Sequence, residues 1–349
     1  MSVIRESFGF MPDKTEIFKY ILENSSGTQA HILTLGATLQ SFIIADKNGE
    51  MKDVLLGFDS VSDYLEKSNY QGATVGRYAN RIGGASIDIN GKNYSLTANE
   101  KNVTSLHSAG DFSYSPWKAV VPDADMVEMS YVSPDGEGGF PGEVSVKVIF
   151  RLTEDNKLSI KYSGVSTKDT YMNFTNHAYF NLNGYDSGDI LSHYLKIDSS
   201  FITPVDELSI PLGGAMSVEN TPFDFREFAR IGERIASDHA QLKMTGGYDH
   251  NFCLPESEGE LREIAQSYSE DSGIKMAVLT TLPGVQFYAG NFLAGAEGKN
   301  GKAMNKRTGF CLETQFYPDT PHQPDFPSCL FKAGEEYVSE TVYAFSLQK

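Results

Sequence analysis

Residues 144–164 read VSVKVIFRLTEDNKLSIKYSG, and this stretch decides the fold class. Apolar and polar residues alternate in residues 144–150 and again in 158–162, on either side of a polar turn at 154–156. An apolar side chain at every second position is typical of a β-strand with one face in a core. Two such runs joined by a short turn predict an antiparallel hairpin.

The alternating pattern recurs along most of the chain. Asn90-Gly91, a dipeptide that favours a tight turn between two strands, separates two alternating segments in ASIDINGKNYSLT. Residues 32–58 predict two or three strands with a turn at 46–49, and residues 340–347 alternate again. These signals predict an all-β fold, a large and mostly antiparallel β-sandwich.

Helical signals are few. Residues 60–67 predict a short helix, because Ser60 precedes Asp63 by three residues as in a capping motif. One or two more short helices are expected within residues 223–243. No change of composition, repeat or flexible linker divides the chain, so we expect residues 1–349 to form a single domain.

The charge balance argues against several classes of ligand. The chain has 29 Lys and Arg against 46 Asp and Glu, a formal net charge of −17. Nucleic acids, anionic membranes and polyphosphates select for basic residues, so none is an expected partner. A neutral small molecule is compatible with this charge.

The cysteines and the hydropathy pattern indicate a compartment. Cys253, Cys311 and Cys329 are widely spaced, which is poor spacing for a disulfide framework or a zinc site. No stretch of about 18 apolar residues and no apolar signal core occurs. We expect a cytoplasmic protein that crosses no membrane.

Common catalytic and cofactor motifs are absent. The chain contains no GxxxxGK[ST], no GxSxG and no HExxH, and no His, Asp and Glu residues at metal-ligand spacing. The sequence therefore predicts no cofactor and no metal.

Two stretches place polar residues on one face of an apolar strand. In FTNHAYFNLNG, residues 174–184, His177 lies on a face of hydrogen-bonding side chains, and the opposite face is apolar. In CLETQ, Cys311, Glu313 and Gln315 share one face. A carboxylate in so apolar a strand would need a cation, a donor or a ligand nearby.

Further polar residues occur in similar stretches: Asn80 and Arg81 in RYANRIGG, His107 in SLHSAG, Asp249 in GGYDHNF, and Gln286 in LPGVQFYAGNF. Each has an ordinary structural explanation, such as a turn, a cap or an ion pair. Together, with Tyr and Phe between them, they are typical of a sugar site. Carboxylates and Arg bind adjacent hydroxyls, and aromatic rings lie against the C–H face of a pyranose.

The chain resembles the galactose mutarotase (aldose 1-epimerase) family over nearly its whole length. The matching segments, in order, are GATVGRYANRIGGASIDINGKNYSLTANE, SLH, SPDGEGGFPGEVSV, TNHAYFNLNG, VDELSIPLG, GGYDHNF, PGVQFYAGNF and CLETQFYPDTPHQPDFPS. The resemblance implies a single-domain β-supersandwich with a sugar cleft. It also implies interconversion of the α and β anomers of free aldohexoses such as D-galactose and D-glucose, without a cofactor, by a monomer or homodimer.

The resemblance also implies roles for individual residues. His177 matches the general acid and Glu313 the general base of the family. His107, Arg81 and Asp249 match sugar-binding residues. Gln286 matches a position that contacts the sugar in some members, and Asn80 is expected at the edge of the site.

Anomer exchange needs two proton transfers. A base removes the proton of the C1 hydroxyl while an acid protonates the ring oxygen, the C1–O5 bond opens, and rotation about C1–C2 precedes reclosure. Glutamate is ionised at neutral pH, so Glu313 suits the base. We expect an acidic neighbourhood to help keep His177 charged as the acid.

Two alternatives remain open. A hexose-6-phosphate 1-epimerase would need extra Lys or Arg at the cleft, and a non-catalytic sugar-binding or regulatory protein would be expected to lose the acid or the base. The segment HSAGDFSYSPW, residues 107–117, departs from the family, which often has two glycines after this histidine and a Gly-Phe-Asp-Lys-like run. The preferred sugar therefore stays open.

Overall fold

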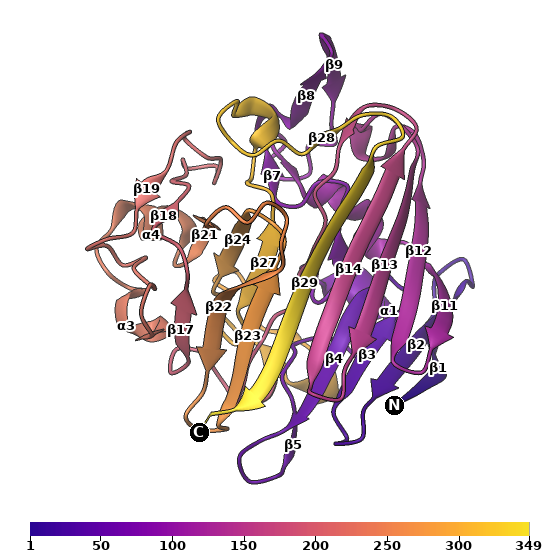
Figure 1. Ribbon diagram of the computed structural model, residues 1–349, viewed down its shortest axis with the longest axis vertical. Helices are drawn as coiled ribbons and strands as arrows, with labels where there is room; N and C mark the ends of the chain where they lie inside the picture. The colour runs from indigo at the N-terminus through magenta and orange to yellow at the C-terminus, as the bar shows by residue number, and fades with distance from the viewer. Residues whose placement is uncertain (349) are drawn as a thin grey trace.

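The hairpin at 144–164 lies inside the largest sheet, away from both of its edges. The computed structural model describes residues 1–348. Val144–Leu152 (β13) pairs antiparallel with Lys157–Ser166 (β14), with Leu152 opposite Leu158 across the turn. Figure 1 shows these long strands running side by side with the C-terminal strand Glu336–Leu347 (β29). The predicted hairpin and the predicted C-terminal strand are confirmed.

Three sheets make up most of the molecule. The nine-stranded sheet has the order β11 (Lys118–Asp123), β12 (Met126–Ser133), β13, β14, β29, β23 (Ile274–Thr280), β22 (Arg262–Tyr268), β17 (Tyr194–Ile197), β20 (Ala229–Arg230). The N-terminal sheet has the order β1 (Ser2–Phe10), β2 (Glu16–Glu23), β3 (Gln29–Leu33), β4 (Thr38–Ala45), β5 (Met51–Asp53). The third has the order β19 (Met216–Ser217), β18 (Phe201–Ile202), β21 (Asp249–Cys253), β24 (Gly284–Tyr288), β27 (Cys311–Gln315).

Five pairs of short strands complete the β structure. They are β7 (Arg81–Ile82) with β10 (Ser105–Leu106), β6 (Thr74–Val75) with β16 (Thr175–Asn176), β15 (Thr170–Tyr171) with β28 (Leu330–Phe331), β25 (Ala296–Glu297) with β26 (Ala303–Met304), and β8 (Ser86–Ile89) with β9 (Lys92–Ser95). In the β8–β9 hairpin, Asn90 and Gly91 have φ of 52° and 76°, as a tight hairpin turn requires. The predicted turn is confirmed.

The sheets pack as a sandwich. Phe42 of β4 stacks on Phe345 of β29 with ring centroids 4.1 Å apart, which joins the N-terminal sheet to the nine-stranded sheet. Leu312 of β27 lies in the same core, and its carbonyl accepts a hydrogen bond from Tyr343 of β29 at 3.4 Å. The predicted antiparallel β-sandwich is confirmed.

Helices are few and short, as predicted. Val61–Lys67 (α1) begins after Ser60, whose hydroxyl accepts a hydrogen bond from the backbone N–H of Asp63 at 3.1 Å. Ile231–Arg234 (α3) and Ala240–Thr245 (α4) lie in the region where one or two helices were expected. Asp111–Tyr114 (α2) was not predicted. No helix within residues 1–348 has the length and hydropathy that a bilayer crossing demands.

The stretch 174–184 differs from a regular strand. Only Thr175–Asn176 (β16) pairs as a regular strand, with residues 74–75. Farther along the segment the partner changes, and Phe180 forms isolated bridges with Leu55 and Phe310. The predicted alternation nevertheless holds: Phe174, Ala178, Phe180 and Leu182 all lie in the core.

A buried lysine joins the N-terminal sheet to the turn Lys299–Gly301 (η4). The ammonium of Lys299 is surrounded by four oxygen atoms: Gln40 O at 2.5 Å, Asp53 Oδ2 at 2.7 Å, Ser41 Oγ at 2.8 Å and Leu55 O at 3.1 Å. Burial lowers the pKa of Lys299, and the charge of Asp53 opposes that shift. The next residue after Leu55 donates its N–H to Tyr179 O at 2.9 Å, so the ammonium stabilises the backbone beside His177.

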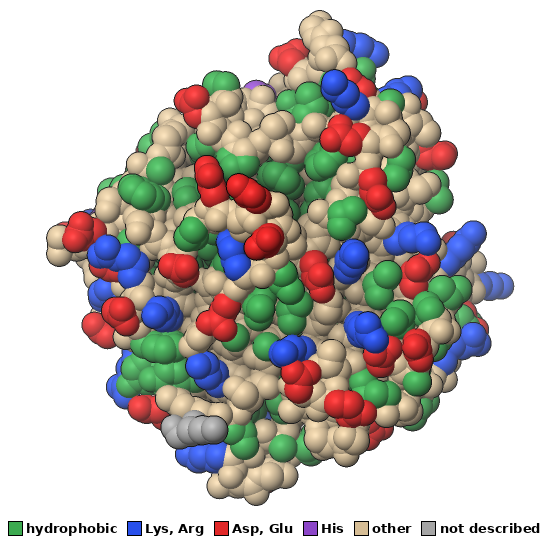
Figure 2. All heavy atoms as spheres, in the orientation of Figure 1, with side chains coloured by type: hydrophobic (Ala, Val, Ile, Leu, Met, Phe, Trp, Pro, Cys, Tyr) green, Lys and Arg blue, Asp and Glu red, His purple; other side chains and the backbone are tan. Residues whose placement is uncertain are grey.

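The surface charge is dispersed. On the face shown in Figure 2, acidic and basic side chains are interspersed with hydrophobic ones, and no large patch of one sign appears there. On this face, at least, the excess of acidic residues is not gathered into one binding surface.

Replacing Lys299 by Met should lower the free energy of unfolding by about 3 kcal/mol, because Asp53 would then be left largely buried without its cation. The measurement is urea unfolding followed by the fluorescence of Trp117, the single tryptophan. Lys302→Met, at an exposed lysine three residues on, is the control and should change stability by less than about 0.5 kcal/mol. Equal losses in both variants would contradict a specific role for the oxygen atoms around Lys299.

Candidate active site

A cavity of about 460 Å³ opens where the third sheet meets the segments around β7, β10 and residue 177. Six of the seven site residues named from the sequence line it: Asn80, Arg81, His107, His177, Asp249 and Glu313. Gln286 does not line the cavity. It lies behind Asp249 and donates a hydrogen bond to Asp249 Oδ1 at 2.7 Å.

The register of the third sheet explains how distant residues come together. Asn251 of β21 lies opposite Gln286 of β24, which lies opposite Glu313 of β27. The adjacent row contains Asp249, Tyr288 and Cys311. Since side chains directly opposite in a sheet share a face, both rows point to the same side. The other side carries Leu312 and packs on β29, so the polar rows face away from the core.

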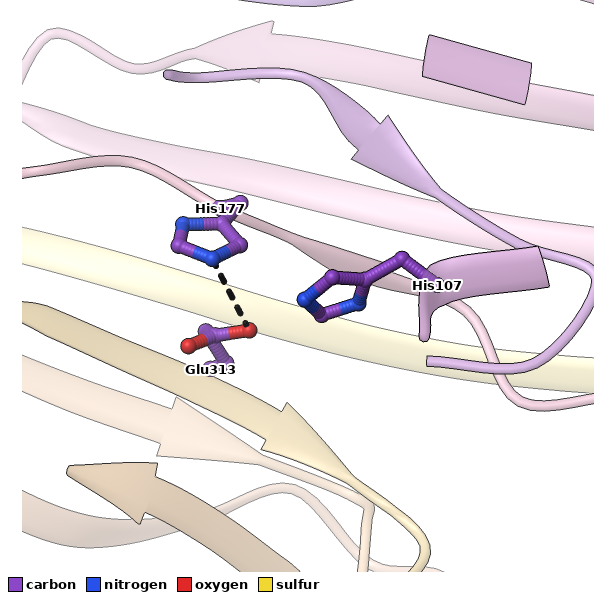
Figure 3. A group of neighbouring side chains, drawn as sticks. All are labelled: His107, His177 and Glu313. Atoms are coloured by element: carbon purple, nitrogen blue, oxygen red, sulfur yellow. Dashed lines mark ion pairs between the residues drawn. The ribbon is translucent and has the colours of Figure 1, made fainter. Parts of the chain in front are cut away.

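His177 and Glu313 face each other at the floor of the cavity. Figure 3 shows the imidazole of His177 above the carboxyl group, with Nε2 3.7 Å from Glu313 Oε2. Both are buried, at 5% and 2% exposure. Glu313 Oε2 has no hydrogen-bond partner among the described residues, so an acceptor atom at the floor remains free for a ligand.

Burial sets the protonation of this pair. Burial raises the pKa of Glu313 well above its usual range; the charge of Asp249 raises it further, and Arg81 opposes the shift. Burial also lowers the pKa of His177 to about 4, partly offset by its own backbone carbonyl. The expectation that an acidic neighbourhood keeps His177 charged is therefore wrong, because no carboxylate offsets the effect of burial on its pKa. Desolvation outweighs the nearby carboxyl group, and burial favours the arrangement with the proton of the pair on Glu313.

His107 enters the cavity as a hydrogen-bond donor. Its Nδ1 accepts a hydrogen bond from the backbone N–H of Asn80 at 3.1 Å, and the backbone N–H of His107 donates to Asn80 O at 3.0 Å. Both residues adopt positive φ, 53° for His107 and 69° for Asn80, which turns the two segments toward each other. Burial lowers the pKa of His107 well below its usual value, so the ring is neutral. A ring that accepts at Nδ1 carries its proton on Nε2.

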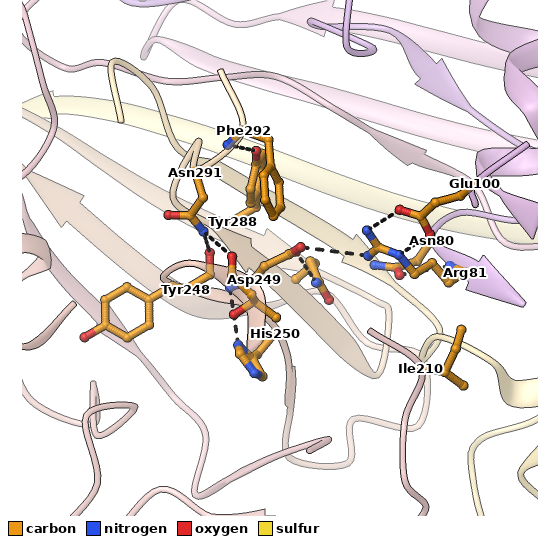
Figure 4. A network of polar contacts seen from close by, with 12 residues as sticks. Asn80, Arg81, Glu100, Ile210, Tyr248, Asp249, His250, Tyr288, Asn291 and Phe292 are labelled. Carbon is orange, nitrogen blue, oxygen red and sulfur yellow. Dashed lines mark hydrogen bonds and ion pairs between the residues drawn. The ribbon is translucent and has the colours of Figure 1, made fainter. Parts of the chain in front are cut away.

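Arg81 is held by carboxylates on two sides. Figure 4 shows its guanidinium between Glu100 and Asp249. Nε and Nη2 donate to Glu100 at 2.8 and 2.9 Å, and Nη1 lies 3.8 Å from Asp249 Oδ2. Although burial disfavours its charge, Asp249 and Glu100 raise the pKa of Arg81. The result is a fixed cation next to carboxylate acceptors, a combination suited to vicinal hydroxyls.

Aromatic residues surround His177; of these, strand alternation in residues 174–184 places only Tyr179 on the face of His177. Tyr70 and Tyr179 lie nearly parallel to the imidazole, with centroids at 6.0 and 5.0 Å. Tyr288 is edge-on at 6.5 Å, and Phe292 is 60% exposed at the rim. Tyr288 lies two positions from Gln286, so strand alternation could have found it as well. Tyr70, in a loop with φ of 64°, gave no such signal.

The divergent loop after His107 reaches the cavity indirectly. Tyr114 of α2 packs on Tyr70 with centroids 5.6 Å apart and donates its hydroxyl to Ser68 O at 3.3 Å. Tyr114 itself does not line the cavity. The altered loop therefore supports an aromatic wall of the cavity.

The cluster in Figure 3 is also a set of possible metal ligands. One atom each of His107, His177 and Glu313 lie within 4.8 Å of one another. Two imidazoles and a carboxylate suit a transition metal. The nearby charge of Arg81, which acts on Glu313, opposes a cation there. The three residues are too far apart in the sequence for any spacing motif.

NMR can test whether the buried carboxyl group of Glu313 is protonated. With glutamate labelled at the carboxyl carbon, one signal should remain that of a neutral carboxyl group at about pH 6, where ordinary glutamates are ionised. Glu313→Gln should remove that signal and so assign it. A spectrum in which every glutamate is ionised at this pH would contradict the proton placement.

The chain matches one known protein family along most of its length. The family model described as Aldose 1-epimerase matches residues 19–344. A galactose mutarotase from Bos taurus is 41% identical over 349 residues, 99% of each chain. An aldose 1-epimerase from Escherichia coli K12 is 36% identical and covers 98% of this chain and 99% of the relative.

Solved structures have the same fold. The galactose 1-epimerase of Lactobacillus acidophilus NCFM is 25% identical, with a TM-score of 0.88 over 100% of both chains. An aldose epimerase homologue from C. elegans is 29% identical, with a TM-score of 0.85 over 94% of this chain and 98% of that one.

Proposed function

The chain belongs to the aldose 1-epimerase family and is an isomerase that interconverts sugar anomers, and we propose that His177 and Glu313 carry out its proton transfers on D-galactose and D-glucose. The observation that carries this proposal is the 3.7 Å separation of His177 Nε2 and Glu313 Oε2 across the cavity floor. The two oxygens that exchange protons, O1 and O5, are bonded to the same carbon. An acid and a base that serve both must therefore lie close together.

The reaction is a reversible ring opening. Glu313, as carboxylate, takes the proton of the C1 hydroxyl, and the electron pair of that O–H bond forms the C1=O1 double bond. The C1–O5 bond breaks, and O5 takes the Nε2 proton of His177. Rotation about C1–C2 presents the other face of the aldehyde. Reclosure returns the protons, with Glu313 as acid and His177 as base.

Burial favours the proton arrangement that the opened sugar requires. In that arrangement Glu313 is protonated and His177 is neutral, which is the direction of both pKa shifts. Binding of the ring form requires the proton to move from Glu313 to His177. Hydroxyl groups that donate to the carboxylate favour this shift, because hydrogen bonds to a charged form stabilise it. Burial thus favours the protonation states of Glu313 and His177 that accompany the open-chain aldehyde.

The remaining polar groups bind hydroxyls. Arg81 and His107 offer donors and Asp249 offers an acceptor, while Asn80 orients His107 through its backbone. Gln286 acts through its hydrogen bond to Asp249 rather than on the sugar. Phe292 and the tyrosine rings provide apolar surface for the C–H face of a pyranose.

A sugar phosphate fits this cavity less well. Its lining has the carboxylates of Glu100, Glu207 and Asp249, and the carboxyl group of Glu313, against two cations, Arg81 and Lys101. Arg81 is already engaged by Glu100 and Asp249. A purely sugar-binding role leaves the acid–base pair unexplained. Turnover of glucose well above that of glucose 6-phosphate is the expected result.

We also propose that residues 1–349 act as one domain in the cytoplasm, on a free aldose, as a monomer or homodimer. The family match over 19–344 and a core shared by the three main sheets support one domain. The free thiols of Cys253, Cys311 and Cys329 suit a reducing compartment.

Glu313→Gln and His177→Asn should each lower kcat about 10²–10⁴-fold, because each removes one proton-transfer group and leaves a polar side chain in its place. The assay is polarimetry on freshly dissolved α-D-galactose or α-D-glucose, with thermal unfolding to check the fold. Glu336→Gln and His31→Asn, which lie outside the cavity, are matched controls and should keep the wild-type rate. A wild-type rate in Glu313→Gln would remove that residue from the base role.

The pH dependence should follow the single proton of the pair. Below about pH 4 His177 gains a second proton while Glu313 stays protonated, so no base remains and kcat/KM falls. At alkaline pH the pair loses its proton, so no acid remains and kcat/KM falls again. The alkaline limb should lie well above the usual pKa of glutamate. Polarimetry across pH, with the spontaneous rate subtracted, measures both limbs. An alkaline limb near pH 4.5 would contradict the raised pKa of Glu313.

A further inference from the structure

Cys311 contacts the catalytic imidazole from outside the cavity. Its Sγ lies 3.5 Å from Nδ1 of His177, within hydrogen-bonding distance for sulfur. The thiol is fully buried and does not line the cavity. It therefore meets the ring on the side opposite to the sugar.

One strand contacts both nitrogens of the ring. Cys311 and Glu313 are two residues apart in β27, so their side chains share a face. Cys311 faces Nδ1 and Glu313 faces Nε2. Pairing of β27 with β24, which places Cys311 opposite Tyr288 and Glu313 opposite Gln286, fixes this spacing.

No other side chain within residues 1–348 bonds to Nδ1, although the backbone carbonyl of His177 itself also acts on the ring. The groups that face the ring from other elements are Tyr70, Tyr179, Tyr288 and His107, and they pack as rings at 5.0–6.5 Å. The position of the proton on a neutral histidine is set by the partner of the other nitrogen. Cys311 is the side chain in place to set it.

We propose that Cys311 is a positioning residue: its sulfur accepts the Nδ1 proton of His177 and so leaves Nε2 as the nitrogen that exchanges a proton with the sugar. The proposal rests on the proposed function of His177. When the imidazolium gives its Nε2 proton to O5, the proton that remains is the one on Nδ1. An acceptor at Nδ1 stabilises that form, and the bare Nε2 is then ready to take the proton back.

A thiol suits this position better than a carboxylate. Burial, with the charges of Glu313 and Asp249, raises the pKa of the Cys311 thiol well above its usual value, so the group stays neutral. A carboxylate at Nδ1 would stabilise the imidazolium and make His177 a poorer acid. A neutral sulfur is a weak acceptor that orients the ring without holding it charged.

The experiment compares Cys311→Ala with Cys311→Ser. Alanine removes the acceptor, and kcat should fall about five-fold with KM unchanged, the effect of one ordinary hydrogen bond. Serine restores an acceptor and should recover the rate to within about two-fold. Cys329→Ala, at a second fully buried thiol outside the cavity, is the matched control and should keep the wild-type kcat.

The nitrogen-15 NMR signals of His177 provide a readout that packing alone would not move. In the wild type and in Cys311→Ser, Nδ1 of the neutral ring should be protonated and Nε2 bare. In Cys311→Ala a mixture of the two tautomers should appear. A bare Nδ1 in the wild type, or an unchanged kcat in Cys311→Ala, would overturn the proposal, as would an equal loss in Cys329→Ala. If Cys311→Ala does not fold, the wild-type tautomer and the Cys311→Ser rate decide alone.

The experiment on Cys311 and the test of the proposed function can fail independently. Absence of mutarotation by the wild type would refute the proposed function, whereas the tautomer of His177 would still be decided by the NMR measurement.

Discussion

The site depends on the cost of keeping the Glu313 carboxyl group out of water. An ionised carboxylate at 2% exposure, with one oxygen unpaired, is unfavourable, and the protein relieves that cost by leaving the proton on it. The same dehydration removes the charge from His177. A single physical effect therefore shifts both members of the pair toward the states that the proposed mechanism requires for an opened sugar. In that mechanism, polar groups of a bound sugar would compensate for the missing water and allow the reverse arrangement.

The sandwich makes this burial possible. The core face of β27 packs against β29, and the other face lies under the segment around His177. The register across β21, β24 and β27 determines which residues meet, since a shift by one residue would turn Glu313 toward the core.

Local signals in the sequence accounted for the strands and not for the site's geometry. The hairpin at 144–164, the Asn90-Gly91 turn and the cap at Ser60 were predictable because each depends on residues close together in the chain. Residues 174–184 formed a regular strand for only two residues, because their backbone partners come from three distant segments that no local pattern reveals. The family resemblance named the polar residues. It did not indicate that Gln286 stands behind Asp249, that Tyr70 flanks the imidazole, or that His177 is neutral. These facts follow from burial and from contacts across more than 30 residues.

The ammonium surrounded by oxygen atoms near β4 and β5 resembles the coordination of a dissolved alkali ion. Here the ion is covalently part of the chain. Its local concentration is therefore fixed, and it cannot be diluted, exchanged or chelated. Dehydration of this cation is completed once, during folding, instead of being repeated with every exchange. The junction beside His177 should accordingly keep its strength in media of very different ionic composition.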